Sequence, residues 1–186
     1  MRTNVKDMCF TALMAVMIAV CSWISIPIGT IPITLQTFGV AAALCILGGK
    51  RGTLSVIVYI LLGAVGVPVF HGFKGGAGVL FGMTGGYILG FVMMGLCFML
   101  LTKLLSDTVP VRIIALAAGL ILCYAFGTVW FMVVYSQVKG EITAISALSM
   151  CVFPFIIPDI IKIAAAVLLS LRLAPVMNRM LAPAAK

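Results

Sequence analysis

Residues Val79–Thr102, VLFGMTGGYILGFVMMGLCFMLLT, form 24 consecutive positions without a charged side chain. About 20 apolar residues in a helix cross the hydrocarbon core of a bilayer, so this stretch predicts a membrane-spanning helix. The composition of the whole chain agrees, because 64% of its 186 residues are hydrophobic and only 9% are charged. A water-soluble domain carries about 25% charged residues, so a soluble globular protein is excluded, and the apolar content also excludes intrinsic disorder.

Working outward from this stretch, five further apolar segments are recognisable, at about Met8–Ile28, Leu35–Leu47, Thr53–Val67, Val111–Tyr135 and Met150–Leu173. Together they predict an all-α membrane protein with six transmembrane helices, as one membrane-embedded domain over residues 1–186. The second and third segments are too short to cross a bilayer unaided. We expect them either to extend into their flanks or to leave the outer part to loops, and short helices beside glycine-rich connections suggest a pocket.

The charged residues predict the orientation. The formal net charge is +8, and with six alternating helices nine basic residues fall on one side, whereas Lys74 and Lys139 fall on the other. The nine are Arg2, Lys6, Lys50, Arg51, Lys103, Arg112, Arg172, Arg179 and Lys186. Basic residues accumulate in cytoplasmic loops, so both termini are expected in the cytoplasm, with the N-terminal segment retained as a first helix. We expect these bases to face lipid headgroups and expect no nucleic-acid partner.

Two kinds of site are not expected on sequence grounds. The six cysteines include no C-x-x-C pair and the chain has a single histidine, which argues against a zinc site and an iron–sulfur site. There is no Gly-x-x-x-x-Gly-Lys-Ser/Thr sequence, so the chain is not expected to hydrolyse ATP itself. We expect no metal and no cofactor.

The strongest candidate for chemistry is the pair Asp159 and Lys162 in FIIPDIIKIAAA, residues 155–166. The two residues are three positions apart, so they share one helical face. Pro158 suits the first position of a helix, which would put Asp159 in the first turn, next to the positive end of the helix dipole. Charges inside a bilayer usually face a protein interior or a watery cavity. The pair is therefore either an internal salt bridge or a polar clamp for a ligand.

Glycine is concentrated in residues 63–95, which contain eleven of the chain's nineteen glycines. The segment FKGGAG, from Phe73 to Gly78, has low helix propensity and predicts a loop whose backbone approaches a ligand closely. Gly82, Gly86 and Gly90 recur every four residues, and plain helix packing explains them at least as well as a site does.

Three weaker signals lie in the first half of the chain. The uncharged connection Gly29–Phe38 offers Thr34, Gln36 and Thr37 as hydrogen-bonding groups, either as a helix cap or as a lid in which Gln36 binds an amide-like ligand. Ala15 and Ala19 form a small-xxx-small pair that lets another helix approach. His71 is interpreted as an exposed loop residue.

Four blocks, in order along nearly the whole chain, resemble the BioY family, the biotin-binding S components of energy-coupling factor (ECF) vitamin importers. The blocks are PITLQTFG (32–39), YILLGAVGVPVF (59–70), GGAGVLFGMTGGYILGF (75–91) and PDIIKIA (158–164). One departure is Met83, where the family commonly has proline, and it should alter the local turn rather than remove a polar contact.

The resemblance implies a six-helix S-component fold in a prokaryotic cell membrane, with an outward-facing biotin pocket. It implies a transmembrane coupling protein and two cytoplasmic ATPases as partners, and the family's contact with the coupling protein maps onto Ala15 and Ala19. The expected ligand-binding residues are Asp159, Lys162, Gln36, Thr34, Phe73, Lys74, Gly75, Gly76, Gly78, Gly86 and Tyr87.

Biotin suits these residues chemically. Asp159 is expected to accept a ureido N–H, and Lys162 to meet either the ureido oxygen or the carboxylate. Backbone N–H groups near Gly75–Gly78, together with Lys74, are the rival site for the carboxylate.

The leading interpretation is a biotin-binding transport subunit that is not itself an enzyme. A solitary secondary carrier without ATPases is the alternative within transport. An intramembrane hydrolase or transferase would need an acid–base pair or a metal motif, and Asp159 is the only acid deep in a span. A structural or assembly membrane protein would leave the Asp159–Lys162 pair and the glycine loop without a ligand.

Overall fold

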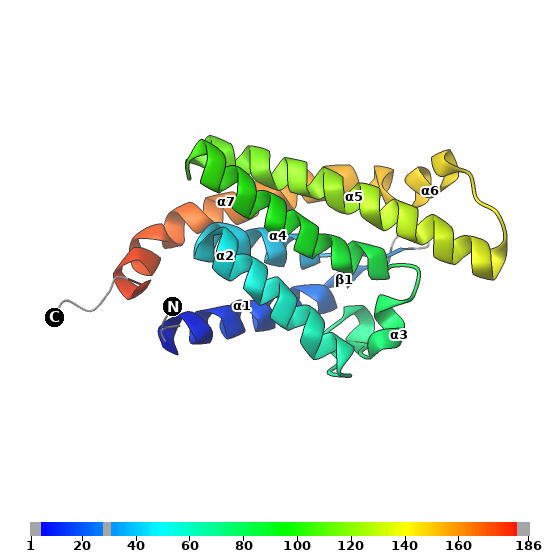
Figure 1. Ribbon diagram of the computed structural model, residues 1–186, viewed down its shortest axis with the longest axis horizontal. Helices are drawn as coiled ribbons and strands as arrows, with labels where there is room; N and C mark the ends of the chain where they lie inside the picture. Colours follow the sequence, from blue (N-terminus) through cyan, green and yellow to red (C-terminus); the bar gives the residue numbers. More distant parts are fainter. Residues whose placement is uncertain (1–4, 28–30, 182–186) are drawn as a thin grey trace.

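The computed structural model describes residues 5–27 and 31–181, and over these ranges the chain is a bundle of long helices (Figure 1). Among the described residues, five helices are long and apolar enough to cross a membrane. They are α1 (Val5–Trp23), α2 (Gln36–Ala64), α4 (Gly85–Leu105), α5 (Val109–Lys139) and α7 (Phe153–Leu181). The shorter elements are β1 (Ser25–Ile26), β2 (Ile33–Thr34), η1 (His71–Phe73), α3 (Ala77–Leu80) and α6 (Ala144–Cys151).

Helix α2 consists of two arms that meet at Gly48, where the backbone is non-helical with φ 80° and ψ 167°. Glycine suits this position because a positive φ is costly for residues with a Cβ. The chain reverses here, since a Cβ on Gly52 would lie 2.6 Å from the Cα of Leu44, whereas residues eight positions apart in a straight helix are about 12 Å apart. The two arms correspond to the second and third segments expected from the sequence.

Both arms of α2 stop short, as one of the two expectations had it. The first arm is preceded by the antiparallel β1–β2 pair, and the second is followed by the loop that contains η1. At about 1.5 Å per residue, the arms are about 18 and 24 Å long, less than the roughly 30 Å of a bilayer core. The strand pair and the loop that contains η1 therefore form the part of the molecule beyond the open ends of the two arms. Gly29 and Thr30 of the expected lid, and Ile28 at the end of the first segment, lie outside the described residues.

Several element boundaries differ from the sequence expectation. The predicted helix from Val79 is interrupted, because α3 ends at Leu80 and α4 begins only at Gly85, where a Cβ would collide with the Leu80 carbonyl. Pro158 lies inside α7, not at its first position, so the placement of Asp159 in the first helical turn is wrong. The strand pair and α6 were not expected, because apolar composition alone does not mark turns within a hydrophobic run.

Glycines bring α4 and α5 close together. A Cβ on Gly86 would collide with the side chain of Trp130, and a Cβ on Gly90 would lie 2.8 Å from Cys123 Sγ. Gly86 and Gly90 therefore allow close packing of α4 on α5, which was one of the two explanations that the sequence offered for them. Ala15 and Ala19 on α1 are also packed inside the chain, at 2% and 4% exposure. Their side chains are not available to a partner in this conformation, so the coupling-protein contact stays a prediction.

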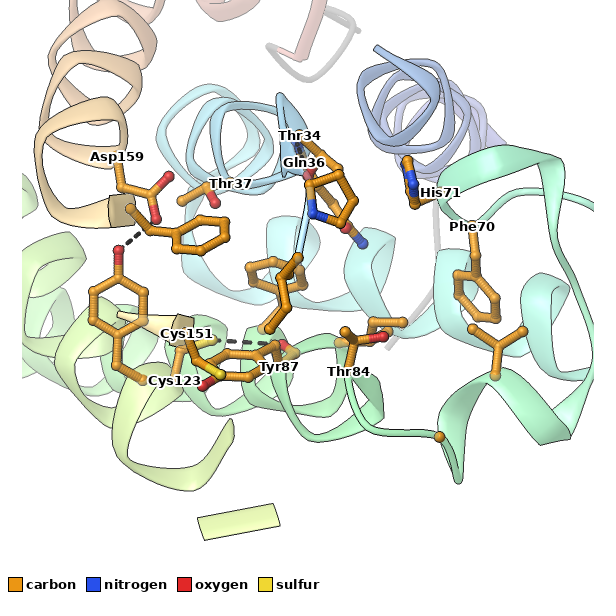
Figure 2. A pocket seen from close by; sticks show the side chains of 18 of the residues that line it. Thr34, Gln36, Thr37, Phe70, His71, Thr84, Tyr87, Cys123, Cys151 and Asp159 are labelled. Carbon is orange, nitrogen blue, oxygen red and sulfur yellow. Dashed lines mark hydrogen bonds between the residues drawn. The ribbon is translucent and has the colours of Figure 1, made fainter. Parts of the chain in front are cut away.

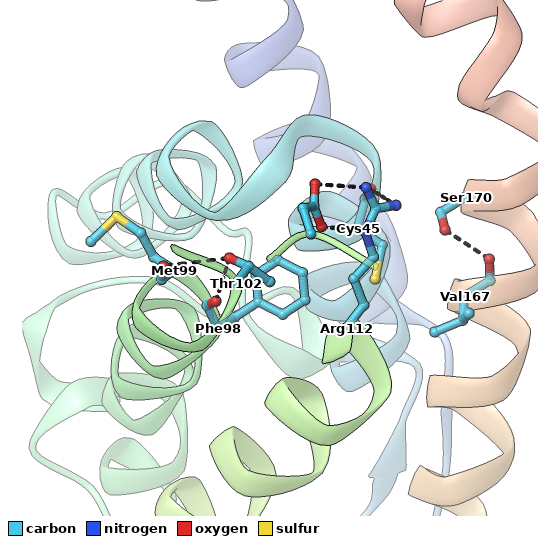
Figure 3. A network of polar contacts seen from close by, with 8 residues as sticks. Cys45, Phe98, Met99, Thr102, Arg112, Val167 and Ser170 are labelled. Carbon is cyan, nitrogen blue, oxygen red and sulfur yellow. Dashed lines mark hydrogen bonds and ion pairs between the residues drawn. The ribbon is translucent and has the colours of Figure 1, made fainter. Parts of the chain in front are cut away.

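Ion pairs gather at one end of the bundle. Arg51 in the second arm of α2 binds Asp7 of α1 at 2.9 Å, and Arg112 of α5 binds Asp107 in the α4–α5 connection at 2.6 Å. Arg112 also donates to the carbonyl of Cys45, near the end of the first α2 arm (Figure 3). The far end of α7 lies at the same end of the molecule (Figure 1). Arg2 and Lys186 of the predicted basic side lie outside the described residues.

Candidate functional site

A cavity of about 390 Å³ opens at the other end of the bundle, where η1 and α3 lie. This volume is within the range of small-molecule sites. Apart from α1, every long helix contributes lining residues. They are Ile31, Pro32, Thr34, Gln36, Thr37, Phe70, His71, Lys74, Gly78, Val79, Gly82, Thr84, Tyr87, Ile88, Phe91, Leu120, Cys123, Tyr124, Cys151, Phe155, Asp159 and Lys162.

A buried polar cluster occupies one side of the cavity. Lys162 Nζ donates to Asp159 Oδ1 at 2.7 Å, and Tyr124 on α5 donates its hydroxyl to Asp159 Oδ2 at 2.6 Å. Figure 2 shows the Asp159 carboxylate at the edge of the cavity, with a dashed line marking its hydrogen bond to a tyrosine hydroxyl. The Lys162 and Asp159 side chains are only 8% and 4% exposed. The pair is thus an internal salt bridge, one of the two alternatives expected of it. Both residues also line the cavity, and the other alternative, a polar clamp for a ligand, stays a prediction.

A second polar group enters from the start of α2. Gln36 lies in the first turn, 7% exposed, and its Nε2 donates to the hydroxyl of buried Tyr59 at 2.7 Å. Thr34 lines the cavity from β2, and its hydroxyl accepts from the Gln36 backbone N–H at 3.3 Å. The start of α2 has no side-chain cap from its N-cap residue, Leu35. Thr34 and Gln36 are therefore held at the cavity wall by the turn that starts α2.

The loop between α2 and α3 forms the opposite wall. Trp23 anchors it from α1, since its Nε1 donates to the Pro68 carbonyl at 3.0 Å and its ring stacks on Phe73 with centroids 4.9 Å apart. Phe70 and Lys74 pair through their backbones, with the Phe70 N–H donating to the Lys74 carbonyl at 2.9 Å. These contacts fix the loop from which His71 and Lys74 line the cavity.

The predicted ligand-binding residues divide into two groups. Seven line the cavity: Asp159, Lys162, Gln36, Thr34, Lys74, Gly78 and Tyr87. Four are not among the lining residues: Phe73, Gly75, Gly76 and Gly86.

Local packing explains where these four residues lie. Phe73 is 65% exposed and stacks on Trp23. A Cβ on Gly75 would collide with the Val67 carbonyl, and Gly76 has a positive φ of 97°. Gly86 packs on α5. Direct contact of these residues with a ligand stays a prediction.

The structure adds lining residues that the sequence analysis missed, above all Tyr124, Thr37 and His71. Tyr124 had a usable signal: a buried tyrosine hydroxyl needs a hydrogen-bond partner, and Tyr124 sits within a long apolar run. His71 was expected to be exposed, but it lines the cavity, and its Nδ1 is buried with no hydrogen-bond partner among the described residues. The other residues that line the cavity come from distant parts of the chain, so the sequence position of His71 alone did not show that it belongs to the cavity wall.

The arrangement favours binding over catalysis. Within residues 5–27 and 31–181, no group of three or more His, Cys, Asp or Glu side chains is placed to hold a metal ion. The acid that lines the cavity already accepts from a lysine and a tyrosine. Charged and neutral donors on a largely apolar wall suit a small, amphipathic ligand with amide-like groups.

Comparison with known proteins identifies the family. The family model described as "BioY family" matches residues 1–179. The chain is 41% identical to the "Biotin transporter BioY" of Thermotoga maritima over 173 residues, covering 93% of this chain and 96% of the relative. It is 38% identical to the "Probable biotin transporter BioY" of Pyrococcus horikoshii, covering 90% of this chain and 96% of the relative.

A solved structure agrees with the family match. The S-component for biotin from an ECF-type ABC transporter superposes with a TM-score of 0.81 at 30% identity, covering 94% of this chain and 95% of that one. Its likeness extends over almost all of both chains, as do the sequence matches. The chain belongs to the BioY family.

Proposed function

We propose that this protein is the biotin-binding membrane subunit, or S component, of an ATP-driven ECF-type importer. The observation that carries the proposal is the buried Asp159–Lys162 pair on the wall of a 390 Å³ cavity. A fused-ring ureido group brings two N–H donors and one carbonyl acceptor, which the carboxylate and the ammonium of this pair match. The apolar remainder of the wall, including Phe91 and Leu120, suits the ring carbons and the aliphatic chain.

The proposed topology has six passes, counting the two arms of α2 separately, with the ion-paired end of the bundle in the cytoplasm of a prokaryotic cell. Its support is the clustering of Arg51, Arg112 and their neighbours at that end. The cavity then faces outward. Partners in this proposal are a transmembrane coupling protein and two cytoplasmic ATPases, with biotin as the cargo and no cofactor.

The decisive experiment is equilibrium binding of labelled biotin to the purified protein in detergent. Saturable binding is expected, with competition by desthiobiotin and none by thiamine. Asp159→Asn and Lys162→Ala should each weaken binding at least tenfold, or about 1.4 kcal/mol. Near-native affinity in both variants would remove the pair from the ligand contacts, whereas failure of the wild type to bind biotin would refute the proposed function.

The alternative within transport, a solitary secondary carrier, is not favoured by the likeness to an ECF-type S-component, and experiment can separate the two. In vesicles that contain this protein alone, an importer subunit should bind biotin without accumulating it. Accumulation without ATPases would favour the carrier. ATP-dependent uptake after addition of a coupling protein and ATPases would support the ECF assignment.

A further inference from the structure

A buried row of polar side chains runs from the wall of the cavity into the interior of the bundle. It consists of Gln36 at the start of the first α2 arm, Tyr59 in the second arm and Ser22 at the end of α1. Gln36 is 7% exposed, and Tyr59 and Ser22 have no exposed surface. Of the three, Gln36 alone is among the residues that line the cavity. Tyr59 and Ser22 can therefore act on a bound molecule only through a neighbour.

Packing alone does not explain the hydroxyl of Tyr59. The ring already packs edge-on against Phe70, with the ring centroids 5.5 Å apart. A phenylalanine would make the same ring contact without burying a polar group, and a buried hydroxyl costs free energy unless it is hydrogen-bonded. The Tyr59 hydroxyl accepts a hydrogen bond from Gln36 Nε2 at 2.7 Å. Its partner is thus the one residue of the row that lines the cavity.

Backbone carbonyls at the inner end of the row set the direction of its hydrogen bonds. Ser22 Oγ lies 2.5 Å from the carbonyl oxygen of Val69 and 2.7 Å from that of Ala19. A carbonyl only accepts, so the single hydroxyl proton of Ser22 is used there. Tyr59 also interacts with the Ser22 hydroxyl, which then offers only lone pairs, so Tyr59 donates to Ser22 and accepts from Gln36. The Gln36 amide is thereby fixed with its nitrogen toward Tyr59.

The oxygen of the Gln36 amide remains available. Within residues 5–27 and 31–181, Gln36 Oε1 has no hydrogen-bond partner, and it is not one of the side-chain atoms that are both fully buried and unpaired. Oε1 therefore keeps accessible surface, on a side chain that lines the cavity. An amide oxygen only accepts hydrogen bonds, so this part of the wall favours a ligand N–H over a ligand carbonyl.

We infer that Tyr59, supported by Ser22, is a positioning residue that turns the Gln36 amide so that its oxygen accepts an N–H of the cargo. This inference rests on the proposed function, in which a ureido group supplies the N–H donors. Without the Tyr59 hydroxyl, the amide is free to rotate and to present its nitrogen, which cannot accept from an N–H. The row fixes the amide before the ligand arrives, so less conformational entropy is lost on binding.

The test measures biotin affinity in a double-mutant cycle of Tyr59→Phe and Gln36→Ala. Gln36→Ala should weaken binding about tenfold, because it removes the acceptor itself. Tyr59→Phe should weaken binding about fivefold, because it removes only the orientation of that acceptor. In the Gln36→Ala background, Tyr59→Phe should change the affinity by less than about twofold, since no amide remains to be positioned.

Two further variants separate positioning from a general structural effect. Ser22→Ala keeps the Tyr59 hydroxyl but removes the acceptor for its proton, and should weaken binding about threefold only while Gln36 is present. Tyr135→Phe removes the hydroxyl of a tyrosine that is not among the lining residues, and should bind biotin as the wild type does. Thermal unfolding without ligand is measured for every variant, because a purely structural role lowers stability and affinity alike in both backgrounds.

The outcomes distinguish this inference from the proposed function. Equal losses from Tyr59→Phe with and without Gln36 would make Tyr59 a packing residue and overturn the inference. Near-native affinity of Gln36→Ala would overturn it as well. Both results leave the proposed function intact, because the wild type still binds biotin saturably. If Tyr59→Phe does not fold, Ser22→Ala in the two backgrounds decides by the same criterion. Failure of the wild type to bind biotin refutes both.

Discussion

The two ends of this bundle use the same kind of ion pair in opposite environments. At the cavity, Lys162 and Asp159 are 8% and 4% exposed, whereas at the basic end Arg112 and Asp107 are 21% and 52% exposed. An exposed pair is screened by solvent and adds little stability. A buried pair carries a large desolvation cost that its own attraction barely offsets, so apolar residues would often serve the fold as well. A buried pair beside a cavity is therefore better explained by a ligand than by stability.

The largest expected effect on stability comes from a substitution that removes only one member of the buried pair. Lys162→Met leaves the Asp159 carboxylate buried without its cation, and should lower the free energy of unfolding by about 3–5 kcal/mol. The double variant with Asp159→Asn removes both charges and should recover most of that stability, but not biotin affinity. Thermal unfolding and equilibrium binding, measured on the same samples, test both statements. Recovery of binding in the double variant would show that the pair serves only the fold.

The next largest effect is expected from comparing alanine substitutions at two glycines, one packed against a neighbouring helix and one that lines the cavity. Gly86→Ala places a methyl group against Trp130, and should destabilise the protein by about 1–3 kcal/mol through overpacking. Gly78→Ala is its control, because Gly78 lines the cavity and a methyl group added there would have no other atom within 4 Å. It should unfold as the wild type does while binding biotin less tightly. Equal unfolding temperatures for the two variants would contradict the packing role of Gly86.

A smaller effect is expected at the third member of the buried cluster. Tyr124→Phe removes only the hydroxyl that donates to Asp159 Oδ2 at 2.6 Å. The variant should lose about 1–2 kcal/mol of the free energy of biotin binding, which corresponds to a roughly five- to thirtyfold weaker affinity. Tyr135→Phe, on the same helix but away from the cavity lining, is the matched control. Tyr124 acts through Asp159, so Tyr124→Phe should add little to an Asp159→Asn variant, and full additivity would count against that role.

The smallest effect belongs to the exposed pair. The hydrogen bond and charge of Arg112 hold the pKa of Asp107 below its ordinary value of 3.8. A carboxylate with a lowered folded-state pKa stabilises the fold above its unfolded pKa, and this contribution disappears as the pH falls through the folded value. Asp107→Asn should therefore cost about 0.2–1 kcal/mol at neutral pH and nothing in sufficiently acidic buffer. A loss that persists in acid, or any loss of biotin affinity, would contradict the contrast between the two ends.

Much of the site was predictable from particular residues. Asp159 and Lys162 stood out because charges are rare inside apolar segments, and their spacing placed them on one helical face. Gln36 was singled out as a hydrogen-bonding residue in an uncharged connection and Lys74 as part of a glycine-rich loop, and both line the cavity. The sequence did not show that Tyr124 meets Asp159, since the two lie 35 positions apart on different helices. Nor did it separate Gly78, at the cavity, from Gly75 and Gly86, which are packed against the chain.

Composition and charge by themselves determined that this chain is a helical membrane protein, because apolar residues in runs of about 20 have no other stable place than a bilayer. Only the tertiary structure decided that both arms of α2 stop short of a full span, that Pro158 lies within α7, and that His71 joins Lys74 at the cavity wall. The physical reason is the range along the chain over which the two kinds of property are set. Hydropathy is a sum over neighbours along the chain, whereas a cavity is made of side chains that packing brings together from distant segments.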